Sequence, residues 1–177
     1  MNQSRFALSR NKLLGDLCER VYQDFMTERG AQVTTSVSVL DNTKDMIVDG
    51  KTTEVKGQAI YRNKNAFTFM DKQARKLATV DVAIFISVPY VYYPDEKLDI
   101  YEWPKHLRSL KEIVLLETSI DVASNETKRH IPVRDCNLIG SYIDQKIVQE
   151  ASGLLSSKYK NFLSKQHTQE TGAYYAR

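Results

Sequence analysis

The segment from Asp45 to Lys56 constrains the fold more than any other part of the chain, because it predicts a tight β-hairpin. Two runs rich in β-branched and apolar residues, 46–48 and 52–55, flank the dipeptide Asp49-Gly50. Asp-Gly tolerates the positive φ angles that a two-residue hairpin turn requires. We therefore expect two antiparallel strands to lie side by side at this point.

Three charged side chains are expected on one face of this hairpin: Asp45, Glu54 and Lys56. A two-residue loop pairs positions whose numbers have an odd sum, and strand side chains alternate with period two. With the loop at Asp49-Gly50, Asp45 lies opposite Glu54. Two carboxylates with Cβ atoms roughly 5 Å apart repel each other unless a positive charge lies between them. A three-residue loop would instead send Asp45 to the opposite face.

A divalent metal ion is one candidate for that positive charge. Carboxylate oxygens suit Mg²⁺ or Mn²⁺. Lys56 would point at the same site, where an ammonium group orients a water molecule or stabilises phosphate charge. The alternative is an exposed hairpin whose charges face solvent, which is common on the open face of a sheet. Both interpretations fit the residues of the hairpin.

An amphipathic helix is predicted ahead of the hairpin. Its apolar residues recur at spacings of three and four, and Gly30 follows its last turn as a stop signal. These apolar residues are Leu14, Leu17, Cys18, Val21 and Phe25. Glu19 belongs with Gly15 to a second strip along the flank of that apolar face. Its position alone makes Glu19 a residue at the boundary between core and solvent.

Three further elements are predicted around the hairpin. Residues 31–40 alternate between valines and polar residues, which is typical of a half-buried strand. Apolar residues between Phe67 and Leu77 recur at spacings of three and four, which indicates a helix. Val80–Val88 is nearly continuous apolar sequence rich in β-branched residues, which indicates a strand buried on both faces.

The hairpin and this order of elements resemble the PD-(D/E)XK nuclease superfamily, which includes many restriction enzymes and archaeal junction resolvases. The residues that carry the resemblance are Asp45 and the triplet Glu54-Val55-Lys56, with Lys44 in the place of the nominal proline. The core of the superfamily has the order helix, three strands, helix, buried strand, which here spans residues 9–88. The resemblance implies an α/β fold with a restriction endonuclease-like core, a central mixed β-sheet flanked by helices.

For the site, the resemblance implies an endodeoxyribonuclease that depends on Mg²⁺, with Mn²⁺ as a substitute. Asp45, Glu54 and the backbone carbonyl of Val55 would hold the metal ion, and Lys56 would act with the two carboxylates in catalysis by orienting the attacking water. The spacing from Gly15 to Glu19 is similar to a glycine-and-glutamate helix in several families of the superfamily. The glutamate of that helix joins the metal site, so Glu19 is a further candidate ligand.

The segment from Lys51 to Lys76 is more basic than the whole chain, with seven basic residues against two acidic ones. Beside a metal site, such a segment is what binding to a phosphate backbone requires. The solvated face of a helix explains the same charges without a ligand. The candidate DNA contacts are Gln58, Tyr61, Arg62, Lys64, Lys72, Arg75 and Lys76.

Beyond Val88 the chain predicts additions to this core. We expect strands at Leu98–Trp103, Ile113–Leu116 and Arg129–Val133, a short helix from Pro104 through Leu110, and a long helix over Ile139–Phe162. Residues 1–165 are expected to form a single domain, and residues 166–177 a flexible tail. His130 is expected to have a structural role or to contact phosphate, rather than to act as a catalytic base.

Composition limits the class of protein without choosing it. A chain of 177 residues suits one domain with a substantial core. A net charge of +3 and a pI near 8.7 permit nucleic-acid binding without requiring it. Cys18 and Cys136 lack CxxC spacing, and the sequence shows no signal peptide and no apolar run long enough to span a membrane, which predicts free thiols in a cytoplasmic protein.

Other chemistries find less support in the sequence. Its three histidines lack the spacing of a zinc site, and no Gly-x-Ser-x-Gly elbow, Walker loop or dinucleotide fingerprint is present. A DNA-binding module of the same fold that no longer cuts is one alternative, although such a module has no reason to keep two carboxylates facing an anionic backbone. A domain whose hairpin charges pair with each other is another.

The target is open. The residues fit a site-specific enzyme of restriction or homing type and a structure-specific resolvase equally well. One active site per chain cuts one strand, so double-strand cleavage would require a homodimer.

Overall fold

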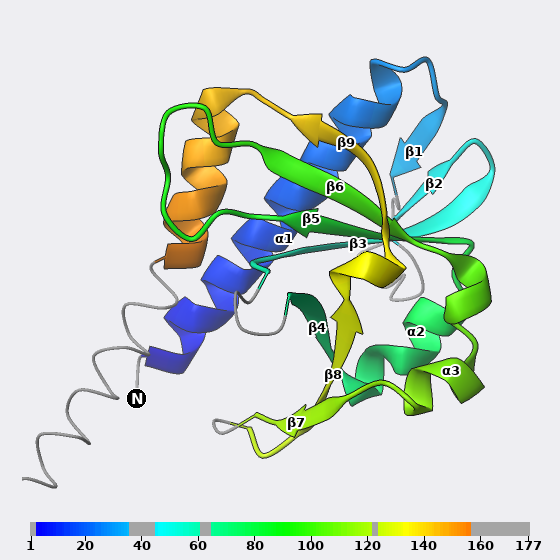
Figure 1. Ribbon diagram of the computed structural model, residues 1–177. Coiled ribbons are helices and arrows are strands. Elements are labelled where there is room, and N and C mark those ends of the chain that lie inside the picture. The colour runs from blue at the N-terminus through cyan, green and yellow to red at the C-terminus, as the bar shows by residue number, and fades with distance from the viewer. Residues whose placement is uncertain (1–2, 36–44, 61–64, 122–123, 157–177) are drawn as a thin grey trace, which may run out of the picture.

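Figure 1 shows a computed structural model that describes residues 3–35, 45–60, 65–121 and 124–156. The helices are α1 (Gln3–Thr27), α2 (Ala74–Thr79), α3 (Leu110–Val114) and a C-terminal helix at residues 145–156. The strands are β1 (Val33–Thr35), β2 (Met46–Val48), β3 (Lys51–Gln58), β4 (Ala66–Met70), β5 (Val82–Ser87), β6 (Leu98–Trp103), β7 (Thr118–Ile120), β8 (Thr127–Pro132) and β9 (Asn137–Tyr142). Short 3-10 turns cover Asp71–Gln73, Lys105–Leu107 and Val133–Asp135.

A mixed sheet of six strands forms the centre of the fold. Its strand order is β1-β2-β3-β5-β6-β9, in which β3 and β5 are parallel and the other neighbours are antiparallel. Helix α1 and the C-terminal helix pack on one face, while α2 and α3 pack on the other (Figure 1). The predicted fold class, an α/β protein with a central mixed sheet flanked by helices, is confirmed.

Strand β5 lies inside this sheet and is buried on both faces. Ile84 and Ile86 belong to the core that includes α1, whereas Ala83 and Phe85 belong to the core that includes α2. Burial on both faces is what a continuous apolar run predicts, since no side of the strand meets water. The prediction for Val80–Val88 is confirmed, with the strand itself covering Val82–Ser87.

The register of β2 and β3 confirms the predicted hairpin. Val48 pairs with Lys51 and Met46 pairs with Thr53, so the loop consists of two residues. Asp49 and Gly50 have φ angles of 48° and 77°. Positive φ at both loop positions is the conformation for which Asp-Gly is suited. The strand predicted at 31–40 is present as β1, and its continuation over 36–40 lies outside the described residues.

The helix predicted between Phe67 and Leu77 is wrong in its first half, because Phe67 and Phe69 lie in β4. This strand joins a second sheet of three strands in the order β4-β8-β7. The two phenylalanines are buried at every second position, and the Phe67 ring stacks on Phe85 with centroids 4.8 Å apart. Aromatic residues at alternating positions favour a strand, so tertiary packing overrides the helical spacing. Only Ala74–Thr79 is α-helical.

Two of the predictions for the C-terminal half are wrong. The strand predicted at Ile113–Leu116 is absent, because Ile113 lies in α3, whose N-terminus is capped by the Ser109 side chain. The next strand, β7, begins two residues after the predicted one. Ile139–Tyr142 lies in β9, which pairs with β6, so the C-terminal helix begins only at residue 145. Only two residues separate β9 from the C-terminal helix, so their apolar residues form one continuous pattern. The spacing of these residues alone does not show where the strand ends and the helix begins.

The other predictions in this half agree better with the structure. Leu98–Trp103 is β6 at the predicted bounds, and β8 covers most of the predicted strand Arg129–Val133. After Pro104, one 3-10 turn precedes α3 instead of a single helix. Within the described residues no helix combines the length and the apolar character needed to span a bilayer.

Candidate active site

Asp45, Glu54 and Lys56 come together where the hairpin meets α2. The ladder between β2 and β3 ends at Met46, and the Asp45 amide donates to the carbonyl of Thr53 at 3.0 Å. The Asp45 carboxylate continues the connection, because its Oδ2 accepts a hydrogen bond from the Val55 amide at 2.8 Å. Asp45 is thus fixed beside the backbone that carries Glu54.

Glu54 is a buried carboxylate at the centre of this group. Its side chain is 0% exposed, and it neighbours the small Ala83 of β5 in the sheet. Lys56 Nζ contacts Oε1, and the Nζ of Lys76 lies 2.5 Å from Oε2. Neither oxygen accepts a hydrogen bond of ordinary geometry within the described part of the chain. Burial raises the pKa of Glu54, an effect that the positive charge of Lys56 opposes.

Lys76, one of the candidate DNA contacts, also belongs to this group. Its ammonium lies 3.2 Å from Asp45 Oδ1 and beside Glu54. Its side chain is 25% exposed, so it is largely withdrawn from solvent. The sequence feature that could have indicated this partly buried position is the neighbouring Leu77, a core residue of α2. Because Lys76 immediately precedes Leu77, it lies beside the buried strip of the helix.

Glu19 is half-buried on α1, and its charge interacts with the same group. Burial, and then repulsion from Asp45, Asp16 and Glu54, raises the pKa of Glu19 to about 7, while Lys56 acts in the opposite direction. When all these side chains are ionised, Glu19, Asp45 and Glu54 carry three negative charges against two positive charges on the lysines. The group is therefore acidic overall.

The donor atoms of this group fit a magnesium ion. In the described residues, no three His, Cys, Asp or Glu side chains are clustered as metal ligands. Asp45 and Glu54 supply hard carboxylate oxygens, and the ammonium of Lys76 bridges the two carboxylates. Mg²⁺ is commonly bound by one or two carboxylates, with water and substrate phosphate completing its shell. Two carboxylates are therefore enough for this metal.

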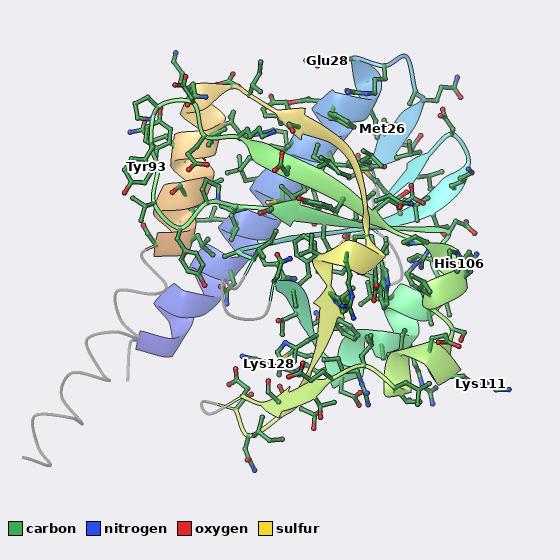
Figure 2. All side chains as sticks on the ribbon, in the orientation of Figure 1. Met26, Glu28, Tyr93, His106, Lys111 and Lys128 are labelled. Carbon is green, nitrogen blue, oxygen red and sulfur yellow. The ribbon has the colours of Figure 1, made fainter. Side chains whose placement is uncertain are left out.

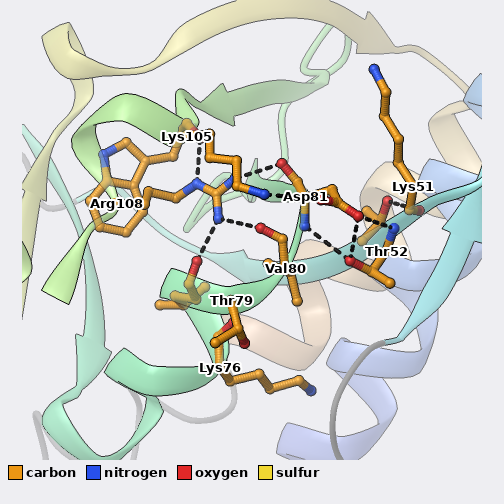
Figure 3. Close-up of polar contacts among 11 residues, drawn as sticks. Lys51, Thr52, Lys76, Thr79, Val80, Asp81, Lys105 and Arg108 are labelled. Carbon is orange, nitrogen blue, oxygen red and sulfur yellow. Dashed lines mark hydrogen bonds and ion pairs between the residues drawn. The ribbon is translucent and has the colours of Figure 1, made fainter.

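The buried side chain of Arg108 holds the end of the helix that carries Lys76 (Figure 3). Its Nη1 donates to the carbonyl of Leu77 at 2.5 Å and to that of Val80 at 3.0 Å. The Nη2 donates to the carbonyl of Asp81 at 2.7 Å, and Nε donates to that of Trp103 at 2.9 Å. The carbonyls of Leu77, Val80 and Asp81 lie at the end of α2 and before β5, so one guanidinium supplies donors that the helix end lacks. The carbonyl of Trp103 lies at the end of β6.

Asp81 extends this connection to the hairpin. Its Oδ2 accepts hydrogen bonds from the Thr52 amide at 3.0 Å and the Thr52 hydroxyl at 2.8 Å. Its Oδ1 pairs with Lys105 at 2.9 Å. The hydrogen bonds from Lys105 and Thr52 lower the pKa of Asp81 to about 2. The segment between α2 and β5 is thus tied to the start of β3, the strand that carries Glu54.

The candidate DNA contacts are distributed over different environments. Gln58 is turned inward, since its side-chain amide donates to the carbonyl of Thr68 at 2.8 Å and accepts from the amide of Thr68 at 2.6 Å. Lys72 and Arg75 are exposed, and Lys72 pairs with Glu126 at 2.9 Å. Tyr61, Arg62 and Lys64 lie outside the described residues.

A pocket of about 320 Å³ opens beside Lys56. Its lining includes Gln58, Thr68, Gln73 and Lys128, from β3, β4, the 3-10 turn before α2, and β8. Lys56 lines this pocket and contacts the buried Glu54, so it lies between the two. Figure 2 shows Lys128 on the lower part of the molecule, at the second sheet.

His130 does not take part in the group. It is buried in the second sheet, where Nδ1 lies 3.1 Å from the Thr68 hydroxyl and Nε2 lies 2.7 Å from the Ser119 hydroxyl. These contacts join β4, β8 and β7, which agrees with the structural role predicted for it. Cys18 and Cys136 form no disulfide within the described residues, and burial raises the pKa of each thiol to about 12.

Comparisons with known proteins give one match to a solved structure. No protein-family model matches the chain, and no curated protein matches it. Among solved structures, the chain is similar to the bacterial homing endonuclease I-Ssp6803I, with 14% sequence identity and a TM-score of 0.41. The match covers 90% of this chain and 96% of that one.

Proposed function

We propose that this protein is a metal-dependent DNA endonuclease of the PD-(D/E)XK type, which hydrolyses phosphodiester bonds. The observation that carries the proposal is the fully buried carboxylate of Glu54, whose two oxygens contact the ammonium groups of Lys56 and Lys76, with the Asp45 carboxylate on the other side of Lys76. Burying an ionised carboxylate costs several kcal/mol unless its partners offset the cost. If Glu54 binds a metal ion, that role explains why a carboxylate is buried at this position.

In this proposal, Asp45, Glu54 and the carbonyl of Val55 hold Mg²⁺ or, in its place, Mn²⁺, and Glu19 is a further candidate ligand. The bound metal ion would supply Lewis-acid stabilisation of the charge that develops on the phosphate. Lys56 has the contacts to orient the attacking water, since its ammonium touches Glu54 at the border of the pocket. Asp45 is held beside Glu54 by the hydrogen bond that its Oδ2 accepts from the Val55 amide.

DNA is the proposed partner. Lys72 and Arg75 are exposed on the segment that carries Lys76, so a phosphate backbone that approaches the acidic group meets positive charge there. Tyr61, Arg62 and Lys64 remain candidate contacts from their sequence alone. A homodimer with two such sites would cut both strands.

Cleavage of supercoiled plasmid tests this function. The wild type is expected to cut with Mg²⁺ and to be inactive with EDTA, whereas Asp45→Asn and Lys56→Ala are expected to lose about a hundredfold or more in rate. Lys111→Ala removes one positive charge from the exposed end of α3 and serves as the matched control (Figure 2). Full activity in both site variants would contradict the assignment. Linear duplex, single-stranded and four-way-junction DNA would then separate the substrate classes.

A non-catalytic DNA-binding module of the same fold is the second candidate. One observation favours it, since Lys56 and Lys76 provide Glu54 with two positive partners from the chain itself. In that case the protein would shift duplex DNA in a gel without cutting it. A domain whose hairpin charges pair with each other is a separate alternative, and calorimetric titration would show no specific Mn²⁺ uptake in that case.

A further inference from the structure

We propose that Lys76 is a built-in counter-ion, which occupies the carboxylates of Asp45 and Glu54 and must leave them when a divalent cation binds. The inference rests on the proposed function, because it concerns the same two carboxylates. It assigns to Lys76 a role that differs from the DNA contact expected from the sequence. Lys76 would set the affinity of the site for metal.

The geometry separates the two lysines of the site. Lys56 contacts one oxygen of Glu54, whereas Lys76 lies 2.5 Å from Glu54 Oε2 and 3.2 Å from Asp45 Oδ1. Lys76 alone therefore bridges both carboxylates. A bridging position between two carboxylates is also the position that a shared cation takes, so Lys76 and a metal ion compete for the same oxygens.

The charges give the direction of the effect. With Glu19, Asp45 and Glu54 ionised and both lysines protonated, the group has a net charge of −1. Without the charge of Lys76 the group would have a net charge of −2, which a divalent cation neutralises. Removing Lys76 thus removes both a competitor and a repulsive charge, and the affinity for a divalent cation should rise.

The attachment of Lys76 allows such a displacement. Its side chain leaves α2 on a flexible stem, with no hydrogen bond from its ammonium to a backbone carbonyl among the contacts described. Figure 3 shows it extending away from the Arg108 network that fixes the helix end. The backbone can therefore stay in place while the ammonium moves. A released ammonium would remain beside the site, where a substrate phosphate is expected.

Calorimetric titration with Mn²⁺ tests this inference without any measurement of cleavage. Wild type, Lys76→Gln and Lys76→Arg would be compared at one pH and one salt concentration, with Lys111→Gln as the control for net charge. We expect Lys76→Gln to bind Mn²⁺ about tenfold more tightly than the wild type. We expect Lys76→Arg, which keeps the charge, to bind no more tightly than the wild type, and Lys111→Gln to match it.

The outcomes distinguish this inference from the proposed function. Wild type that takes up no Mn²⁺ would overturn the metal site itself. Wild type that binds Mn²⁺, together with unchanged or weaker affinity in Lys76→Gln, would overturn the role of Lys76 alone.

Should Lys76→Gln fail to fold, NMR of the lysine ¹³Cε–¹Hε groups in the wild type provides the second test. The Lys76 signal should shift when Mg²⁺ is added, while that of Lys111 should not. An unchanged Lys76 signal at saturating Mg²⁺ would overturn the inference.

Discussion

The guanidinium of Arg108 donates to the carbonyl of Leu77 at 2.5 Å, and this contact fixes the end of the helix from which Lys76 reaches Glu54. Arg108 is fully buried, and the partners of its hydrogen bonds are backbone carbonyls. Burial lowers the pKa of its guanidinium, but Arg remains charged because its ordinary pKa is so high. A cation inside the protein thus compensates the negative end of α2 and the turn that follows it.

Substitution of Arg108 should therefore destabilise the fold strongly. Arg108→Met fills most of the same space but leaves up to four carbonyls without their donor, so we expect the free energy of unfolding to fall by about 3 kcal/mol or more. Arg108→Lys keeps the charge but not the planar fork, and should give an intermediate loss. Urea denaturation measures both. A loss below about 0.5 kcal/mol in Arg108→Met would contradict this account.

The side chain of Gln58 forms hydrogen bonds with both the amide and the carbonyl of Thr68, in place of another strand's backbone. The two hydrogen bonds to the Thr68 backbone connect β3 of the central sheet with β4 of the second sheet. Gln58→Met should lower the free energy of unfolding by about 2 kcal/mol, since both backbone groups lose their partner. Lys72→Met, at an exposed site, should change it by less than about 0.5 kcal/mol. Equal effects of the two substitutions in urea denaturation would argue against a structural role for Gln58.

The hairpin and β5 could be predicted from the sequence, whereas the contacts of Gln58 and Lys76 could not. The hairpin followed from local chemistry, because Asp-Gly determines the loop and strand parity then places the neighbouring side chains. The burial of β5 followed from its composition. The partners of Gln58 and Lys76 lie 10 to 31 residues away in the chain, in elements whose packing no local pattern describes.

The same limit explains the error at Phe67. Spacings of three and four between Phe67 and Leu77 fit a helix, and the alternation of Phe67 with Phe69 fits a strand. Pairing with β8, about 60 residues further along the chain, decides between them. Arg108 lies in the segment Pro104–Leu110, for which the sequence predicts a short helix, and nothing in that segment indicates that its arginine is buried.

Gly57 tests how closely α1 approaches the site. A Cβ at this position would overlap the Sγ of Cys18 on α1, with the Cys18 Cβ at 3.0 Å. Gly57→Ala should therefore push α1 away from β3 and lower the free energy of unfolding by about 1–3 kcal/mol. Cys18→Ala in the same chain removes the sulfur and should recover part of that loss, which makes the double substitution less harmful than the sum of the single ones. Additive effects in urea denaturation would mean that the two residues do not compete for space.

Glu19 predicts a dependence of stability on pH in the metal-free protein. Its pKa in the folded state is raised to about 7 from the ordinary 4.5, chiefly by burial, so the folded state binds more protons than the unfolded state between these values. Stability must fall as pH rises through that window, because deprotonation then favours the unfolded chain. Glu19→Gln stays neutral and should lose less stability than the wild type between pH 5 and pH 8.

The measurement is thermal or urea unfolding in EDTA at several pH values. Asp24→Asn, on the same helix, serves as a control for the removal of one carboxylate. The difference between wild type and Glu19→Gln should be small near pH 5 and should grow in favour of the variant toward pH 8. Parallel pH profiles for the two proteins would mean that burial and the neighbouring carboxylates do not raise the pKa of Glu19 in the folded state.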